Sequence, residues 1–228
     1  MKKALNIIFV IILLPFVTAT TNSDNPVAVI KKAVNNVQQK SLAGEWIKSN
    51  KGGILYDGME VKTGYKSLAV IQFTDNSGIL TVRENCVANI YAAQKNKKMD
   101  KNTVINRGVV HFDVNKQSPD EEFKFTTPTV VASIRGTSGY IEVEKDSTTN
   151  IVCEKGVIEV EALKGSKEKG TVSAGGSISI ANDGFVKNSG ISSEQQSKLK
   201  KSKQVEIKTL KIRTQEGVLE IKYLPEEQ

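Results

Sequence analysis

The sequence predicts an all-β fold, and two features of its patterning support this prediction. Short apolar–polar alternations recur along most of the 228 residues, and turn signals separate them. Leu68–Phe73 is predicted as one strand, Asp75–Gly78 as a polar turn that ends in glycine, and Ile79–Val82 as the returning strand. Apolar residues make up 39% of the chain and charged residues 25%, which is the composition of a globular protein.

The later segments continue this pattern. Val110, Phe112 and Val114 share one face of a predicted strand, whereas His111 and Asp113 lie on the opposite face. We therefore expect short antiparallel or mixed strands in a two-sheet roll or a β-solenoid-like stack. The expected core comprises Leu68, Val70, Phe73, Val82, Val110, Phe112, Phe125, Ile134, Ile141, Ile151, Ile158 and Ile178.

The N-terminus resembles a secretory signal peptide. Lys2 and Lys3 form a positive n-region, Ala4–Leu14 is almost wholly apolar, and Val17–Ala19 supplies small residues at a cleavage site. The apolar stretch is shorter than the ~20 residues that span a bilayer, although an uncleaved signal anchor is the alternative. We therefore expect a periplasmic or secreted protein. Because no Cys follows the stretch, a lipoprotein anchor is not expected.

The charge balance points to anionic partners. The formal charge is +7 for the whole chain, and it stays positive when the two N-terminal lysines are removed. Outside the cytoplasm, such a charge suits a lipid headgroup, an anionic envelope polymer or an acidic protein, and the compartment argues against nucleic acid. Solubility alone is the alternative explanation. Membrane contact is expected only through the signal segment, if it is not cleaved.

The two cysteines leave two possibilities open. An oxidising compartment permits a disulfide between Cys86 and Cys153. It would close a loop of about 67 residues and stabilise the fold by roughly 4 kcal/mol. Both cysteines have apolar neighbours, however, so two buried free thiols are the other possibility.

Three segments need separate treatment. The spacing of Val27, Ile30, Val34 and Val37 is helical, yet valine and isoleucine favour strands. Ser192–Lys203 is polar and Lys-rich, and it is either a short helix or an ordered linker. Lys208–Leu224 alternates on both sides of a Gln-Glu-Gly turn, which predicts a C-terminal β-hairpin.

Several motifs resemble the FecR family. Leu55–Gly64 resembles its opening pattern of an apolar residue, a polar–Gly turn and Val-x-Thr-Gly, and Gly108–Val114 resembles its Gly-x-Val-x-Phe-x-Val strand. The most specific match is Phe125–Thr137, where Phe-x-Thr-Pro precedes an apolar strand and Ile-Arg-Gly-Thr. The resemblance covers roughly Ala28–Phe185 and implies a pair of opening strands at Ala28–Gln38. It assigns structural roles to Gly58, Thr63, Gly64, Gly108, Pro128, Arg135, Gly136, Thr137 and Gly156.

The resemblance also implies a division of the chain and a limit on its role. We expect a signal peptide at 1–19, a FecR-like β domain at 20–187, and a Lys-rich linker with a hairpin at 188–228. Membrane-spanning FecR regulators carry a cytoplasmic segment that binds a sigma factor, followed by one transmembrane helix. Only three residues precede the apolar stretch here, so we expect the stand-alone exported version.

The sequence shows no pattern typical of an enzyme, and no cofactor or metal is expected. His111 is the only histidine and is expected to be solvated, and the two cysteines lack the spacing of a metal site. The alternating Glu142, Glu144, Glu159 and Glu161 are interpreted as solvated strand faces, with Ca²⁺ binding or acid–base work as the alternative. A sugar platform would need Trp46, Tyr56, Tyr91 and Tyr140 to cluster.

Two functions remain. The first is a non-enzymatic binding or signalling module that recognises a protein or an envelope polymer. The second is an extracytoplasmic component of a sigma-factor/anti-sigma system that acts with a separate membrane protein. For the first function, an exposed β edge, such as that of the C-terminal hairpin, would pair with a partner strand.

Overall fold

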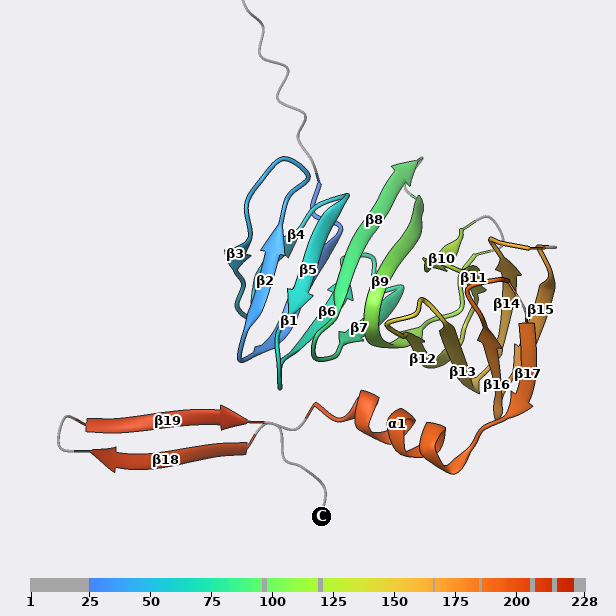
Figure 1. The fold of residues 1–228 in the computed structure, drawn as a ribbon. Coiled ribbons are helices and arrows are strands. Elements are labelled where there is room, and N and C mark those ends of the chain that lie inside the picture. Colours follow the sequence, from blue (N-terminus) through green and yellow to red (C-terminus); the bar gives the residue numbers. More distant parts are fainter. Residues whose placement is uncertain are drawn as a thin grey trace, which may run out of the picture.

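The computed structural model describes residues 25–95, 98–118, 121–165, 167–184, 186–205, 208–214 and 217–223. The predicted signal peptide, residues 1–19, lies outside these ranges. Within them the chain is mostly β-strand with one short helix, which confirms the predicted all-β class (Figure 1). No helix in the described ranges has the length and apolar character needed to cross a bilayer.

Strands β1–β17 form one hydrogen-bonded network of 17 strands that folds into two layers, here called sheet A and sheet B. Sheet A contains, in spatial order, β4 (Ile54–Leu55), β1 (Ala28–Val34), β6 (Leu68–Phe73), β7 (Gly78–Val82), the second part of β9 (Lys98–Val114), β12 (Ser138–Val143), β13 (Thr149–Lys155), β16 (Gly176–Ile180) and β17 (Val186–Gly190). All of these neighbours are antiparallel.

Sheet B contains, in spatial order, β3 (Ile47–Lys48), β2 (Val37–Lys40), β5 (Met59–Thr63), β8 (Val87–Lys95), the first part of β9, β10 (Phe123–Thr126), β11 (Val130–Ile134), β14 (Val157–Ala162) and β15 (Lys169–Ser173). Its strands are antiparallel except for the β9–β10 pair. The mixed two-sheet arrangement agrees with the predicted architecture.

Strand β9 belongs to both sheets. Its residues up to Arg107 pair with β8 and β10 in sheet B, whereas Gly108–Val114 pair with β7 and β12 in sheet A. Gly108 has a φ of +96°, a conformation that glycine adopts without strain, and this is where the strand changes sheet. A single strand therefore joins the two layers covalently at the middle of the molecule.

The core lies between the two layers. Phe73 and Phe123 meet edge to face with ring centroids 5.2 Å apart, and Phe125 lies 5.1 Å from Phe112. Because these rings come from both sheets, they close the interface. The other predicted core residues are buried, except Val70. Leu68 is buried as well, but it does not lie between the two layers.

Val70 is the exception, because its prediction as a core residue is wrong. The inward positions of β6 are Ala69, Ile71 and Phe73, so strict alternation turns Val70 to the outer face, where it is half-buried. Leu68 is fully buried, but it lies outside the main core cluster. It is the cross-strand partner of Val34, on the outer side of sheet A.

The ambiguous segments are resolved. The opening segment forms β1 and β2 joined at Asn35, which has a φ of 58°, so the strand reading is confirmed and the helical spacing was misleading. Ser193–Lys203 forms helix α1, and Ser192 is its N-cap. The Ser192 hydroxyl accepts from the Gln195 amide, and the Gln195 side-chain oxygen accepts from the Ser192 amide. The predicted hairpin is confirmed as β18 (Lys208–Thr214) and β19 (Gly217–Tyr223).

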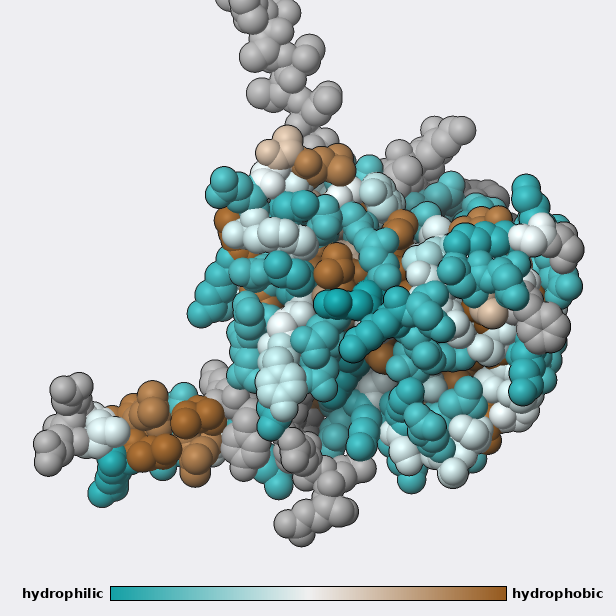
Figure 2. Space-filling model, in the orientation of Figure 1, coloured by the Kyte–Doolittle hydropathy of each residue, from teal (hydrophilic) through white to brown (hydrophobic). Residues whose placement is uncertain are grey.

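The hairpin projects away from the two-layer body, on the far side of α1 from β17 (Figure 1). In the space-filling view it forms a conspicuous apolar patch (Figure 2). The hairpin therefore projects beyond the sheets, and together with α1 it forms the C-terminal appendage of the domain.

Candidate functional site

Most of the residues that the FecR resemblance singled out lie where the chain crosses between the sheets. Gly58 precedes β5, Thr63 ends it and Gly64 follows it. Gly108 lies within β9, and the Arg135–Thr137 segment joins β11 to β12. Gly156 separates β13 from β14, and Pro128 lies instead in the β10–β11 connection within sheet B. The structure thus brings these positions to the rims of the two layers rather than to one pocket.

One rim shows why small residues are needed. The Thr137 amide and the Val114 amide donate to each other's carbonyls at 3.0 Å, and the Thr137 hydroxyl donates to the Val157 carbonyl at 3.0 Å. A Cβ on Gly156 would lie 2.7 Å from the Gly136 carbonyl oxygen. The two crossings therefore pack backbone against backbone.

Thr63 closes another rim. Its hydroxyl accepts from the Cys86 amide at 3.1 Å and donates to the Arg83 carbonyl, while the Gly64 amide donates to the Asn36 carbonyl at 2.9 Å. Arg135, by contrast, is exposed and makes no hydrogen bond or ion pair with the other residues that the structure describes. The structural role that the resemblance implies for Arg135 therefore involves no polar contact of its guanidinium within the described residues.

Both cysteines are free and fully buried, so the structure contains the two thiols in place of the disulfide that the sequence left open. Burial raises the pKa of Cys86 to about 12 and that of Cys153 to about 11. These thiols are protonated at neutral pH and are poor nucleophiles.

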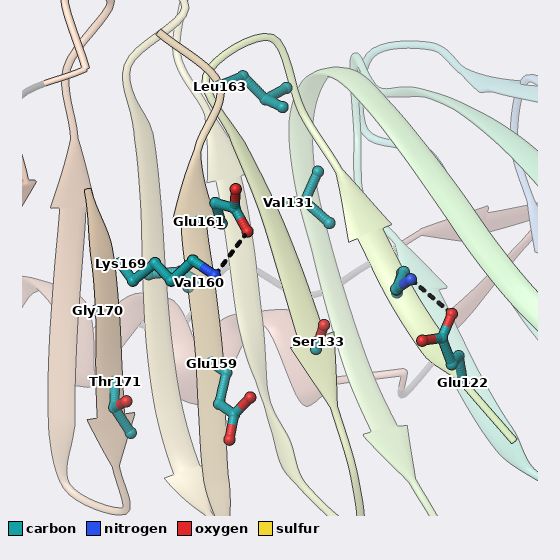
Figure 3. Close-up of a pocket in the computed structure, with 11 residues that line it drawn as sticks. Glu122, Val131, Ser133, Glu159, Val160, Glu161, Leu163, Lys169, Gly170 and Thr171 are labelled. Atoms are coloured by element: carbon teal, nitrogen blue, oxygen red, sulfur yellow. Dashed lines mark hydrogen bonds and ion pairs between the residues drawn. The ribbon is translucent and has the colours of Figure 1, made fainter. Parts of the chain in front are cut away.

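An open groove of about 540 Å³ lies on the outer face of sheet B (Figure 3). Val131 and Ser133 of β11 form its floor because their side chains are short. Lys124 of β10 lies on one side, and Glu159 and Glu161 of β14 lie on the other. The floor and walls come from strands whose cross-strand partners are fixed by the ladder, since Ser133 pairs with both Lys124 and Glu159.

The groove carries mixed charge with an acidic excess. Lys124 contacts Glu122 at 2.5 Å and Lys169 contacts Glu161 at 3.5 Å, so both lysines are neutralised locally. Glu159 lines the groove and makes no ion pair within the described part of the chain. The solvated-face interpretation fits Glu159 and Glu161, while the groove between them was not visible in the sequence.

The other two glutamates of the alternating set have partners. Both oxygens of Glu142 accept from Lys198 of α1, at 3.0 and 2.9 Å, and Glu144 accepts from Asn150 at 2.6 Å. Glu154 of β13 likewise pairs with Lys203. Helix α1 is therefore attached to the outer face of sheet A chiefly by polar contacts.

The helix corrects the expectation for His111. The residue does lie on the outer face of β9, but it is only 8% exposed because α1 packs beside it. The pKa of His111 is lowered to about 4, chiefly by burial and also by the nearby Lys203, although Glu154 and Asp113 act in the opposite direction. Its Nε2 atom has no hydrogen-bond partner among the described residues. His111 is thus a buried neutral side chain under a polar helix.

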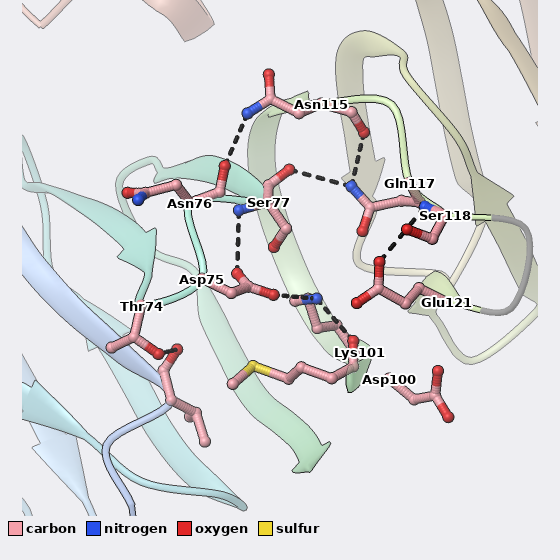
Figure 4. Close-up of polar contacts among 12 residues, drawn as sticks. Thr74, Asp75, Asn76, Ser77, Asp100, Lys101, Asn115, Gln117, Ser118 and Glu121 are labelled. Carbon is pink, nitrogen blue, oxygen red and sulfur yellow. Dashed lines mark hydrogen bonds and ion pairs between the residues drawn. The ribbon is translucent and has the colours of Figure 1, made fainter. Parts of the chain in front are cut away.

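An ion pair that the sequence pattern did not indicate joins the buried Lys101 to Asp75 (Figure 4). Lys101 of β9 points inward, and its Nζ donates to the Met99 carbonyl and contacts Asp75 Oδ2, both at 2.6 Å. Asp75 also accepts from the Ser77 amide at 3.0 Å. Burial tends to raise the pKa of Asp75, but the bonds from Lys101 and Ser77 prevail and lower it. The predicted turn role of Asp75 is therefore only part of its contribution.

The aromatic residues do not form a platform. Tyr140 is fully buried on the outer face of sheet A, Tyr91 lies in β8 of sheet B, and Tyr56 lies between β4 and β5. Lys40 and Lys62 lie over the ring of Trp46, at 5.1 and 4.4 Å from its centroid. Across the described ranges, no group of three or more histidine, cysteine and carboxylate side chains has metal-binding geometry.

Comparison with known proteins agrees with this architecture. Residues 59–159 match the family model described as FecR protein. No curated protein matches the sequence. A solved structure described as a "putative anti-sigma factor" from Parabacteroides distasonis ATCC 8503 is similar, with a TM-score of 0.51 and 12% identity over 60% of this chain and 62% of that chain. A second structure with the same description gives a TM-score of 0.49, again at 12% identity over 60% and 62% of the two chains.

The two-layer sheet with glycine-bearing crossings is an all-β domain, and the polar groove on the outer face of its sheet B is open to solvent. The match of residues 59–159 to the FecR family model confirms the resemblance stated from the motifs. At 12% identity the solved neighbour shows the fold alone, and the chain spans about three fifths of that neighbour.

Proposed function

We propose that the protein is a non-enzymatic signalling module that recognises a protein partner outside the cytoplasm through the groove on sheet B. The observation that carries the proposal is the groove itself, in which a low floor of Val131 and Ser133 is bordered by charged side chains on neighbouring strands. An extended polypeptide could lie in this groove and meet charges of both signs.

The charge of the groove favours a protein over an anionic envelope polymer. Glu122, Glu159 and Glu161 outnumber Lys124 and Lys169, so a polyanion would meet net repulsion. A peptide segment with basic side chains would pair with Glu159, which has no ion-pair partner in the described part of the chain. The basic net charge of the whole protein arises elsewhere.

Photo-crosslinking in the native cell tests the proposal. A photoreactive residue at Val131 in the groove should capture a specific protein, whereas the same residue at the exposed Lys187 of β17 should not. Ser133→Trp should fill the groove and abolish capture without changing the melting temperature. Equal capture from both positions, or capture that survives Ser133→Trp, would refute this site.

A second function deserves the same test. The solved neighbour is described as a "putative anti-sigma factor", and this description and the FecR match support the alternative, an extracytoplasmic component of a sigma-factor/anti-sigma system that acts with a separate membrane protein. The identity of the crosslinked partner separates the two. A membrane protein encoded beside a sigma factor favours the second function, and a secretion or adhesion component favours the first.

A further inference from the structure

The C-terminal hairpin has one apolar face that the protein leaves uncovered. Its register places Leu210 opposite Ile221 and Ile212 opposite Leu219, so all four side chains share a face. They are between 40% and 52% exposed. A two-stranded sheet with an open apolar face is marginal in water, which indicates that this face has a partner under working conditions.

The opposite face and the adjoining helix are basic. Thr209, Lys211 and Arg213 alternate with the apolar residues of β18, and Lys211 pairs with Glu220 at 2.8 Å. Residues 198–223 of the sequence contain eight lysines and arginines against three glutamates, a formal charge of +5. Apolar and cationic groups therefore occur together in one appendage.

The appendage is held at the surface of sheet A up to its base. Arg83 donates to the Gln204 carbonyl at 2.7 Å and Lys32 donates to the Val205 carbonyl at 2.5 Å. These bonds fix the point from which the hairpin leaves the body (Figure 1). The hairpin thus projects from a defined place on the domain and not from a long tether.

The size of the apolar face argues against a second copy or another folded protein. Four aliphatic side chains, each about half exposed, offer on the order of a few hundred Å², well below the roughly 800 Å² per partner of a stable interface. A bilayer needs no matching shape, and its anionic headgroups add an attraction of long range to the basic residues.

We propose that the hairpin β18–β19 is a membrane-surface element. Its apolar face enters the boundary between headgroups and acyl chains of an anionic bilayer, while Lys211, Arg213 and the exposed Lys200 and Lys201 of α1 remain at the level of the phosphates. This inference goes beyond the proposed function, since it uses a different surface and a different class of partner. It also adds a membrane contact to the one expected of the signal segment.

A local probe tests the proposal in the full chain. Because Cys86 and Cys153 are buried, a polarity-sensitive dye should label a single introduced cysteine at Ile212 on the apolar face, or at Arg213 on the opposite face. Vesicles of phosphatidylcholine mixed with phosphatidylglycerol should shift the emission at position 212 to the blue but leave position 213 nearly unchanged. The shift should be absent with pure phosphatidylcholine and decrease as salt is raised.

A second measurement compares binding strengths. In sedimentation with the mixed vesicles, Leu210→Glu/Leu219→Glu should bind about tenfold more weakly than the parent protein, while Thr209→Ser should bind equally. No emission shift at position 212, or equal shifts at both positions, would overturn the proposal. A shift at position 212 that grows with protein concentration in the absence of lipid would also overturn it, because it would identify a second copy as the partner.

Discussion

The Nζ atom of Lys101 lies 2.6 Å from Oδ2 of Asp75, and this ion pair joins β9 in sheet B to the β6–β7 turn of sheet A. The two partners differ in their access to water. The Lys101 side chain is fully buried, whereas the Asp75 side chain is 28% exposed. Removing one partner should therefore cost more than removing the other.

Asp75→Asn should destabilise the fold by about 3 kcal/mol or more, because it leaves a buried ammonium without a counter-charge. Lys101→Met should cost less, since Asp75 can turn to solvent. The double variant should recover part of the loss of the first. Urea unfolding of all four proteins measures the free energies, and equal costs for the two single variants would contradict the assigned asymmetry.

Gly108→Ala should destabilise by more than about 2 kcal/mol because the new methyl group combines a positive φ with a steric clash. A Cβ at this position would lie 2.7 Å from Cβ of Cys86. Gly190→Ala is the matched control, because a Cβ there meets no atom within 4 Å and the change should stay within about 0.5 kcal/mol. Thermal or urea unfolding compares the two, and similar costs would show that the bend of β9 tolerates a side chain.

Acidification should destabilise the folded protein through His111. Its pKa of about 4 in the fold lies below the ordinary 6.5, so the unfolded chain binds the proton first as the pH falls. The stability that neutral His111 contributes is complete above pH 6.5 and is lost between 6.5 and 4, with a magnitude on the order of 3 kcal/mol. Urea unfolding between pH 4 and 8 should show this slope.

His111→Gln removes the titrating group and should flatten the slope. The charged side chains facing His111 are Arg83, Asp113, Glu154 and Lys203, and they remain in this variant. Limited proteolysis between 191 and 205 at each pH reports whether α1 detaches. An unchanged slope in the variant would assign the pH dependence to those neighbours.

The native protein should resist thiol reagents at neutral pH. Cys86 and Cys153 are buried with raised pKa values, so Ellman's reagent should release almost no colour until urea is added. Two thiols per chain should then react. The intact mass of material exposed to air should show no loss of hydrogen, and a disulfide-linked product would contradict the buried free thiols.

The strands and most of the core could be predicted because a period of two is a property of the extended backbone itself. Phe112, Ile141 and Ile151 lie in the core as expected. Val70 could not be placed in this way. Every second residue of β6 points inward, and the sequence does not show which of the two alternating sets that is when both contain apolar residues. The helical spacing of Val27, Ile30, Val34 and Val37 was misleading for a related reason. A turn at Asn35 separates β1 from β2, so these residues do not belong to one regular element.

The contacts of α1 and the groove could not be predicted, because they depend on which distant strands become neighbours. Lys198 and Glu142 are 56 positions apart, and their pairing requires the path of β12. Lys101 gave a weak local signal, since it occupies the inward phase between Met99 and Thr103, but its partner Asp75 lies on another sheet.

The chain enlarges its two layers alternately, and this has a consequence for how such proteins vary in length. The family match ends at residue 159, within β14, yet the layers continue through β15, β16 and β17. Each of these later strands pairs only with strands already in place or with the next one added. Whole hairpins can therefore be gained or lost at this end during evolution without shifting the register of the earlier strands. Insertions near β9, by contrast, would disturb both layers at once.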